Sequence, residues 1–215
     1  MRYKQLIFRT VFIFLSAYLI SILLWIQIKD YYGYVVTATA SMLVAELKNV
    51  RVENIRQEKD TVYTSFCRSL RNEELVVELP FITSSYTFNV PLTLSIVASL
   101  CPFIARRRRA CIETALLLVV VHFIYVFSQG AEQLTYIFMG KGIESFSRLK
   151  LFLYQFSWGF TDNMLIRFEP FLIGFYMYTR FEKQNFKKPM AVKIQKYKFA
   201  DSIHIFQQDK KERGQ

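Results

Sequence analysis

Cys101, Cys111 and His122 are the side chains that could supply a thiol nucleophile and its general base. Cys111 and His122 are eleven positions apart, so on one helix they would be separated by about 16 Å along the axis. Cys101 ends one apolar segment and His122 lies past the middle of the next, so their depths are poorly matched. We therefore expect no thiol catalysis, and we expect His122 to be a hydrogen-bond partner between helices.

Arg167 and Glu169 are charged residues at the start of another apolar segment, next to Pro170. Because they are two positions apart, they do not face each other on a helix, and each needs another partner or must reach water by snorkelling. Both interpretations stay open. Pro170 has no N–H, so a carbonyl one turn earlier also needs a partner. Together with Asp162 and His122, these charged residues define a possible polar cluster within the membrane.

Other catalytic and cofactor patterns are missing from the sequence. It contains no Gly-rich phosphate loop, no HExxH or GxSxG motif and no paired-carboxylate pattern. It also has no CxxC pair and no His/Cys cluster of the kind that binds zinc. We therefore predict no cofactor, no metal site and no enzymatic activity. Cys67 lies in a polar region and is expected to be a lone thiol that reacts readily from outside the membrane, unlike Cys101.

Four apolar segments are candidates to carry these side chains across a membrane. A transmembrane helix needs about 20 apolar residues, and the candidates span about 8–28, 88–105, 111–128 and 163–180. The first follows a basic start but is long and ends without a small-residue cleavage site, which predicts a retained anchor and not a signal peptide. In the second, Pro91 fits the first turn of a helix. The fourth is the weakest, because its first half contains the charged residues and Pro170.

The net charge of +11 is concentrated in three segments. They are the first nine residues, the loop between the second and third segments, and the tail that begins at Arg180. With four crossings all three lie on one side, which the positive-inside rule assigns to the cytoplasm. Glu113 is expected to be a local charge partner of the loop arginines. The distribution favours anionic lipid over nucleic acid. The residues expected at the lipid surface are Arg106, Arg107, Arg108, Arg109, Lys187 and Lys188.

The region between the first two crossings predicts a small outer lobe. Residues 31–48 can form an amphipathic helix, and three alternating stretches then read as strands. The strands are Val50–Ile55, Thr61–Phe66 and Leu75–Leu79, with a polar turn at Arg56–Asp60 and a further extended stretch at Phe81–Phe88. Between the third and fourth crossings, Leu149–Phe160 is short and carries Lys150, which favours a position in the membrane interface or a partial dip into the protein. Thr161–Asn163 then predicts an N-cap for the last crossing.

This layout resembles the small membrane proteins associated with bacterial exosortases, in particular those of type H. The resemblance covers residues 1–181 and rests on three stretches: Phe88 to Leu94, Tyr154 to Phe156, and Arg167 to Leu172. It implies an accessory role beside an exosortase, a membrane thiol enzyme that cleaves a C-terminal sorting helix at the outer face of the inner membrane. The catalytic Cys, Arg and His of that system belong to the exosortase and are not carried over to this chain.

We therefore predict a mainly α, polytopic inner-membrane protein with about four transmembrane helices, a small extracytoplasmic α+β lobe and both termini in the cytoplasm. Residues 1–29 are the first anchor, 30–87 the lobe, 88–181 three further helices with an interfacial segment near 143–160, and 182–215 a basic tail. The expected partners are membrane lipid and an exosortase-like membrane protein, and not nucleic acid. Two alternatives stay open: a membrane enzyme or transporter component that uses the Arg167/Glu169 region, and an envelope scaffold that binds a partner through the lobe.

Overall fold

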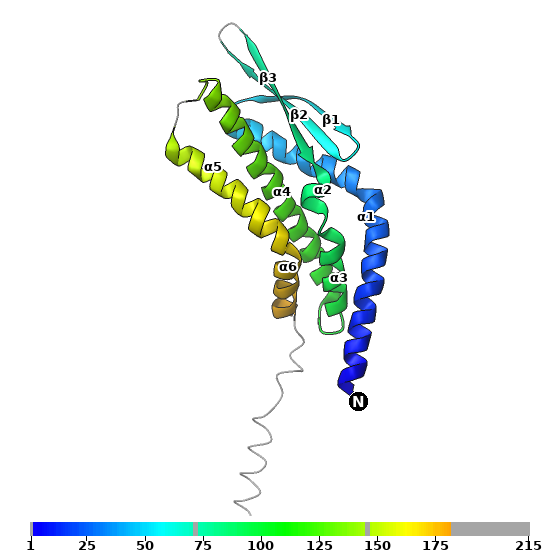
Figure 1. Cartoon of the computed structure of the whole chain (residues 1–215). Helices are drawn as coiled ribbons and strands as arrows, with labels where there is room; N and C mark the ends of the chain where they lie inside the picture. The colour runs from blue at the N-terminus through cyan, green and yellow to red at the C-terminus, as the bar shows by residue number, and fades with distance from the viewer. Residues whose placement is uncertain (1, 71–72, 145–146, 182–215) are drawn as a thin grey trace, which may run out of the picture. The chain divides into compact units, whose positions relative to one another are not determined.

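The computed structural model describes residues 2–70, 73–144 and 147–181. The chain divides into two compact units, Met1–Phe181 and Glu182–Gln215. The second unit lies outside the described residues, and with it the predicted basic tail. Six α-helices, one π-helical turn and a three-stranded sheet make up the described part of the first unit (Figure 1).

The first helix, α1 (Arg2–Lys48), is much longer than the predicted anchor. It contains the apolar segment 8–28 and continues without interruption through residues 31–48, which were expected to form a separate helix. Figure 1 shows that α1 bends between its lower and upper halves. It ends where Asn49 adopts a left-handed conformation and the Val50 N–H donates to the Ala45 carbonyl, a pairing that satisfies an end of the helix.

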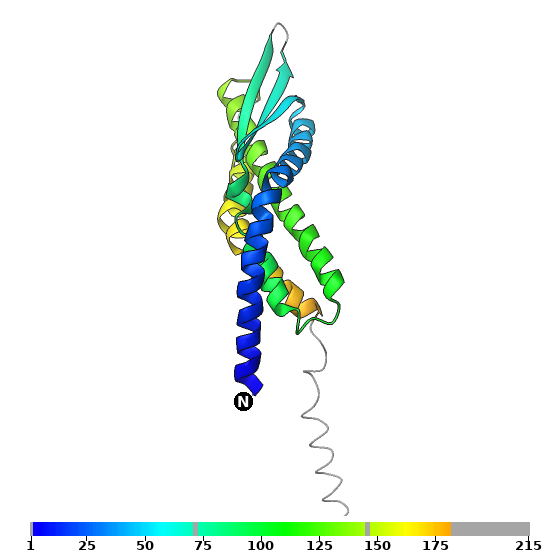
Figure 2. The ribbon, with the colours of Figure 1, turned by 90° about the vertical axis from the view of Figure 1, so that its right-hand side faces the viewer.

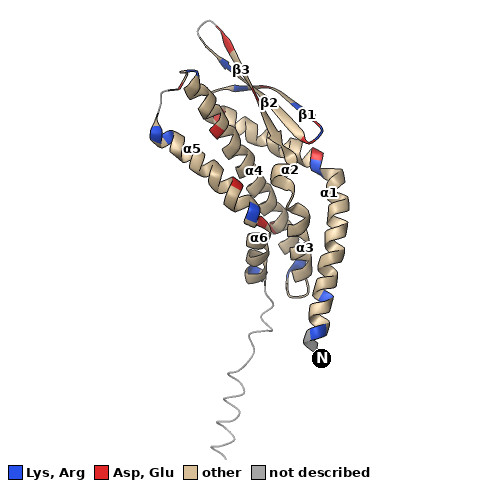
Figure 3. Cartoon of the chain, in the orientation of Figure 1, with Lys and Arg blue, Asp and Glu red and all other residues tan. Residues whose placement is uncertain are grey.

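The second long helix is α4 (Arg107–Gly140), which contains the predicted crossing 111–128. Within the described residues, α1 and α4 are the two helices that are long and apolar enough to cross a membrane. Figure 3 shows long uncharged stretches on both of them. At about 51 Å, α4 is longer than the hydrocarbon core of a bilayer, which is about 30 Å thick.

The other two predicted crossings correspond to shorter helices. α3 (Val90–Leu100) has Pro91 in its first turn, as expected, but ends well before residue 105. α6 (Ile166–Phe181) is joined through a π-helical turn, η1 (Thr161–Leu165), to α5 (Arg148–Phe160). The predicted N-cap at 161–163 is therefore wrong, because the backbone continues through that point as helix. The helical run instead begins at Ser147, whose hydroxyl accepts from the Lys150 N–H.

The sheet follows α1 and has the antiparallel order β1-β2-β3 (Figure 2). Its strands are β1 (Arg51–Glu58), β2 (Thr61–Ser69) and β3 (Glu74–Ile82), so all three strand predictions are confirmed. The predicted turn at 56–60 is too long, because β1 pairs with β2 as far as Glu58 and only two residues turn. The predicted extended stretch at 81–88 is wrong beyond Ile82, where the short helix α2 (Thr83–Thr87) begins.

Asp60, in the turn between β1 and β2, explains why a helix starts at Thr83. The Asp60 carbonyl accepts from the Thr83 N–H at 2.8 Å, and its carboxylate accepts from the Ser84 N–H at 3.3 Å and from Lys29 Nζ at 3.1 Å. Burial alone would raise the pKa of Asp60, but the hydrogen bonds from Ser84 and Lys29 outweigh it and lower the pKa. A turn between two strands thus supplies the acceptors for the first N–H groups of α2.

Two groups of buried apolar side chains form the core. The outer group packs the sheet against the upper half of α1 and against α4, with Phe66, Phe81 and Phe138 at its centre. The inner group joins α3, α4 and α6 through Val97, Leu118 and Met177. Cys67 is only 2% exposed, so the expectation that it reacts readily from outside is wrong.

Candidate functional site

A chain of buried polar side chains connects four helices between the two apolar groups. Tyr32 of α1 lies with its hydroxyl 2.7 Å from His122 Nδ1 of α4. His122 Nε2 lies 3.0 Å from Glu169 Oε2 of α6. The Thr93 hydroxyl of α3 donates to Glu169 Oε1 at 3.0 Å. We call Tyr32, His122, Glu169 and Thr93 the polar chain.

Three of the four members of the polar chain are enclosed by protein, and Tyr32 is partly buried. Thr93 and His122 have no exposed surface and Glu169 is 1% exposed. One assignment of protons satisfies all the atoms: Tyr32 O–H donates to Nδ1, a neutral His122 donates from Nε2–H, and the Glu169 carboxylate accepts from both His122 and Thr93. Because a buried carboxylate is stable only when its oxygens are paired, this arrangement ties the position of α6 to α3 and α4.

Tyr86 of α2 extends this polar region toward the sheet. Its hydroxyl donates to the Gly33 carbonyl at 3.2 Å and lies 3.2 Å from the Thr37 hydroxyl, so it holds α2 on α1. Its ring meets the His122 ring at a steep angle, with centroids 5.6 Å apart. The aromatic contacts continue from Tyr86 to Tyr125 and from Tyr125 to Trp158 of α5. The imidazole is therefore fixed by rings as well as by hydrogen bonds.

Pro170 lies inside α6, and its missing N–H leaves the Ile166 carbonyl without its usual partner. Asn89, the residue before α3, donates from Nδ2 to this carbonyl at 2.7 Å. The sequence predicted that a freed carbonyl would need a partner, and the structure identifies it. Asn89 is buried, so no water is needed at this position to satisfy the backbone.

We expect Asn89→Ala to lower the free energy of unfolding by about 2 kcal/mol, because it leaves the buried Ile166 carbonyl unsatisfied. Pro170→Ala restores a backbone N–H that can donate to the same carbonyl. Asn89→Ala should therefore cost much less in the Pro170→Ala background than in the wild type, as measured by unfolding of the purified chain in detergent. Equal costs in both backgrounds would contradict this role of Asn89.

The four members of the predicted polar cluster separate into two places. His122 and Glu169 are bonded to each other inside the polar chain. Asp162 is half-buried and accepts from the Tyr125 hydroxyl at 3.5 Å, whereas Arg167 is exposed. Arg167 and Glu169 therefore point to different surroundings, as their spacing on a helix predicted. Tyr32, Thr93 and Asn89 were missed. Asn89 and Thr93 are polar residues within the apolar run 88–105, which was a signal for these two but not for Tyr32.

The arginines at the start of α4 and at the end of α6 pair with Glu113, the local charge partner that the sequence predicted. Arg109 Nε lies 2.9 Å from Glu113, and Arg180 Nε of α6 lies 3.0 Å from the same carboxylate. The Ala105 N–H also donates to the Phe181 carbonyl. The start of α4, with Arg106 as the residue before it and Arg107 and Arg108 in its first turn, and the end of α6 thus lie together. Lys187 and Lys188 lie outside the described residues.

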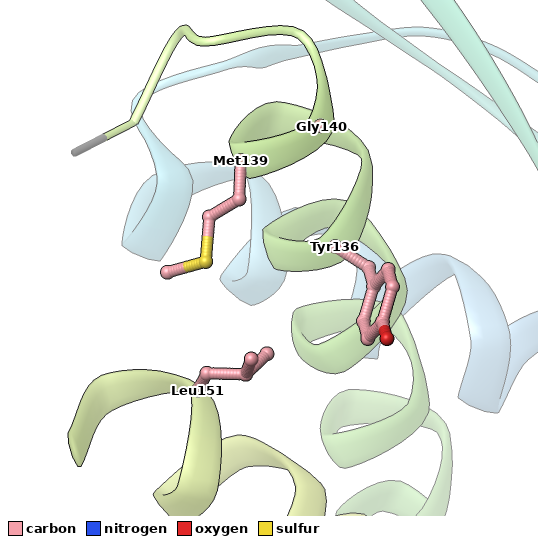
Figure 4. Close-up of a pocket in the computed structure, with 4 residues that line it drawn as sticks. All are labelled: Tyr136, Met139, Gly140 and Leu151. Carbon is pink, nitrogen blue, oxygen red and sulfur yellow. The ribbon is translucent and has the colours of Figure 1, made fainter. Parts of the chain in front are cut away.

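Asp162 and Arg167 line an open cleft of about 620 Å³ between α2, α4 and the junction of η1 and α6. Its other lining residues are Ser85, Phe88, Tyr125 and Ile166. A smaller cavity of about 240 Å³ lies between α4 and α5. Figure 4 shows Met139 and Leu151 reaching toward each other across it, beside Tyr136. The smaller cavity brings together no charged groups, whereas the cleft has an acidic and a basic side chain in its lining and is therefore a candidate for binding a ligand.

The three thiols are separate from the polar chain. The Cys101 thiol donates to the Val97 carbonyl at 3.6 Å, Cys111 is exposed, and Cys67 lies in β2. Over residues 2–70, 73–144 and 147–181, no group of three His, Cys, Asp or Glu side chains could hold a metal ion. His122 is thus surrounded by hydroxyl groups and a carboxylate.

Comparison with known proteins gives one family. The model of the family described as exosortase H-associated membrane protein matches residues 4–181, which include the whole polar chain and the cleft. No curated protein and no solved structure shows a significant match to the chain.

Proposed function

This chain belongs to the family of exosortase H-associated membrane proteins, and on that basis we propose that it is a non-catalytic accessory subunit of an exosortase-type protein-sorting system. The family match carries the proposal. It is supported by the chemistry of the polar chain, whose histidine contacts no thiol. With exposed fractions of 0% and 1%, His122 and Glu169 are not accessible to a substrate at the surface, which favours a role in holding helices together.

We propose that the chain crosses the bacterial inner membrane about four times with both termini in the cytoplasm. The contacts of Glu113 with Arg109 and Arg180 support this topology, because they require the loop after α3 and the end of α6 to be on the same side. The third and fourth crossings would then be α4 and the helical run of α5, η1 and α6. The second would be α3 with its flanking residues, in a part of the membrane narrowed around it.

α5 supplies a surface that suits a membrane partner. It has no buried residue, and Phe152, Phe156 and Phe160 stack in a row along one side with exposed fractions of 50–60%. Large exposed apolar surfaces mark contacts with protein or lipid. We place the contact with an exosortase-like protein on this row. This assignment gives a partner-binding role to residues 149–160, which the sequence predicted to lie in the membrane interface or to dip partly into the protein.

The test is co-purification of the full chain from native membranes. We expect an exosortase-like membrane protein to be recovered with the wild type, and the recovery to fall at least about ten-fold in Phe152→Ser/Phe156→Ser, which removes two aromatic anchors. Val76→Ser changes a similarly exposed apolar residue on β3 and should leave the recovery unchanged.

Repeated purification without an exosortase-like protein would contradict the proposed partner. Recovery that is lost with Val76→Ser but not with the α5 variant would instead favour the scaffold alternative, in which the lobe binds an envelope protein. The alternative of an enzyme or transporter component that uses Arg167 and Glu169 together is disfavoured, because one is exposed and the other is enclosed.

A further inference from the structure

The π-helical turn η1 brings Asp162 and Arg167 to the same cleft. The two residues are five positions apart, and in a regular α-helix such residues lie about 140° apart around the axis. In η1 the Ile166 N–H bonds to the Thr161 carbonyl, five residues back, so residues five apart lie nearly above one another. Both Asp162 and Arg167 consequently line the cleft. Single π-helical turns within α-helices are frequent at functional sites.

The two opposite charges do not neutralise each other. Among the residues that the structure describes, Arg167 forms no ion pair, and Asp162 accepts a side-chain hydrogen bond from the Tyr125 hydroxyl. The walls that carry these charges are held in place, because Asn89 anchors the Ile166 carbonyl between them. The cleft thus presents one anionic and one cationic side chain, on a backbone that Asn89 anchors at Ile166.

The position of the cleft along α6 indicates a lipid environment. Arg167 is thirteen residues from Arg180, which is about 20 Å along the helix, whereas the hydrocarbon core is about 30 Å thick. If α6 crosses the membrane as proposed above, the cleft lies where an unperturbed bilayer has acyl chains. Phe88, which lines the cleft, is 55% exposed, and Met164 and Phe168, which are close in sequence to its lining residues on η1 and α6, are each at least half exposed. Unpaired charges at such a depth are costly without a partner.

We propose that this cleft binds the headgroup of a zwitterionic phospholipid, with the phosphate at Arg167 and the ammonium group at Asp162. Ser85 and Tyr125 line the same space: the Ser85 hydroxyl can donate to a phosphate oxygen, and the Tyr125 ring can face the ammonium group while its hydroxyl donates to Asp162. The volume of about 620 Å³ is within the range of small-molecule sites. The acyl chains lie on the apolar side chains around the opening.

The test uses the purified full chain in detergent and native mass spectrometry with added phosphatidylethanolamine. We expect the wild type to retain one lipid at concentrations where Arg167→Gln retains about ten-fold less, since a charge-assisted contact to the phosphate is lost. Arg148→Gln removes an exposed arginine of α5 outside the cleft and should bind like the wild type. Arg167→Lys keeps the charge and should keep most of the binding, which separates loss of charge from loss of fold.

Two further arms identify the ligand. Asp162→Asn should abolish a preference for phosphatidylethanolamine over phosphatidylglycerol, because only the former carries an ammonium group. Inorganic phosphate should not displace the lipid. Equal retention by the wild type and Arg167→Gln would overturn the proposal. So would displacement by free phosphate, which would indicate a site for a soluble anion, or an unchanged lipid preference in Asp162→Asn. None of these outcomes depends on the exosortase-like partner.

Discussion

Replacing Glu169 by Ala is expected to lower the free energy of unfolding by about 3 kcal/mol, because breaking a buried, hydrogen-bonded pair leaves the remaining groups unsatisfied. The substitution removes the acceptor of both the His122 Nε2–H and the Thr93 hydroxyl, neither of which has any exposed surface. It also opens a cavity between three helices. Unfolding of the purified chain in detergent, followed by helical content, measures the loss. Glu46→Ala changes an exposed glutamate of α1 and should have little effect.

A double-mutant cycle with His122→Ala shows whether the pair acts as a unit. Once Glu169 is gone, His122 has already lost one of its two polar contacts, so the second substitution should cost less than it does in the wild type. Additive costs would contradict a coupled pair. Tyr32→Phe removes only the hydroxyl at Nδ1, and because a hydrogen bond contributes about 1 kcal/mol to stability, it should be the mildest change in the polar chain.

The sequence was informative about residues that need a partner and uninformative about which partner they have. His122, Glu169 and the carbonyl freed by Pro170 were all recognisable as polar groups in apolar surroundings. Their partners are 47 to 90 positions away for His122 and 77 positions away for the Ile166 carbonyl. A single sequence contains no direct signal for such distances. Tyr32 in particular looks like any other aromatic residue near a membrane interface.

The elements were predicted where the signal is local and missed where it is not. The alternation of apolar and polar residues marked all three strands correctly. The helix that begins at Thr83 depends on Asp60, which lies in the turn between β1 and β2 and is distant from Thr83 in the sequence. The local pattern around Thr83 therefore wrongly favoured an extended chain. The continuous run through η1 was missed for the same reason. Judged by local sequence alone, Asp162 and its neighbours favour the start of a helix. In the structure, Tyr125 and Asn89 hydrogen-bond to Asp162 and to the Ile166 carbonyl, and these contacts from distant parts of the chain hold the segment in place.

Gly33 carries the second large expected effect. It lies in α1 against Thr83, and a Cβ at this position would overlap the Cγ2 and Oγ1 atoms of that threonine. Thr83 has no exposed surface and its N–H is bonded to the Asp60 carbonyl, so it cannot move away without breaking the start of α2. The Gly33 carbonyl also accepts from Tyr86, whose ring contacts His122. Separating α1 from α2 would therefore disturb the polar chain as well.

We expect Gly33→Val to lower the free energy of unfolding by about 3 kcal/mol, the upper part of the usual range for overpacking in a core. Gly159→Val is the matched control, because it is also in a helix interior and a Cβ there meets nothing within 4 Å. The two variants share the change in helix propensity and differ in the overlap. Thr83→Ala removes both overlapping atoms, so it should restore most of the stability of Gly33→Val. If Gly33→Val and Gly159→Val unfold alike, or if Thr83→Ala gives no rescue, the close approach of α1 and α2 is not what requires glycine at position 33.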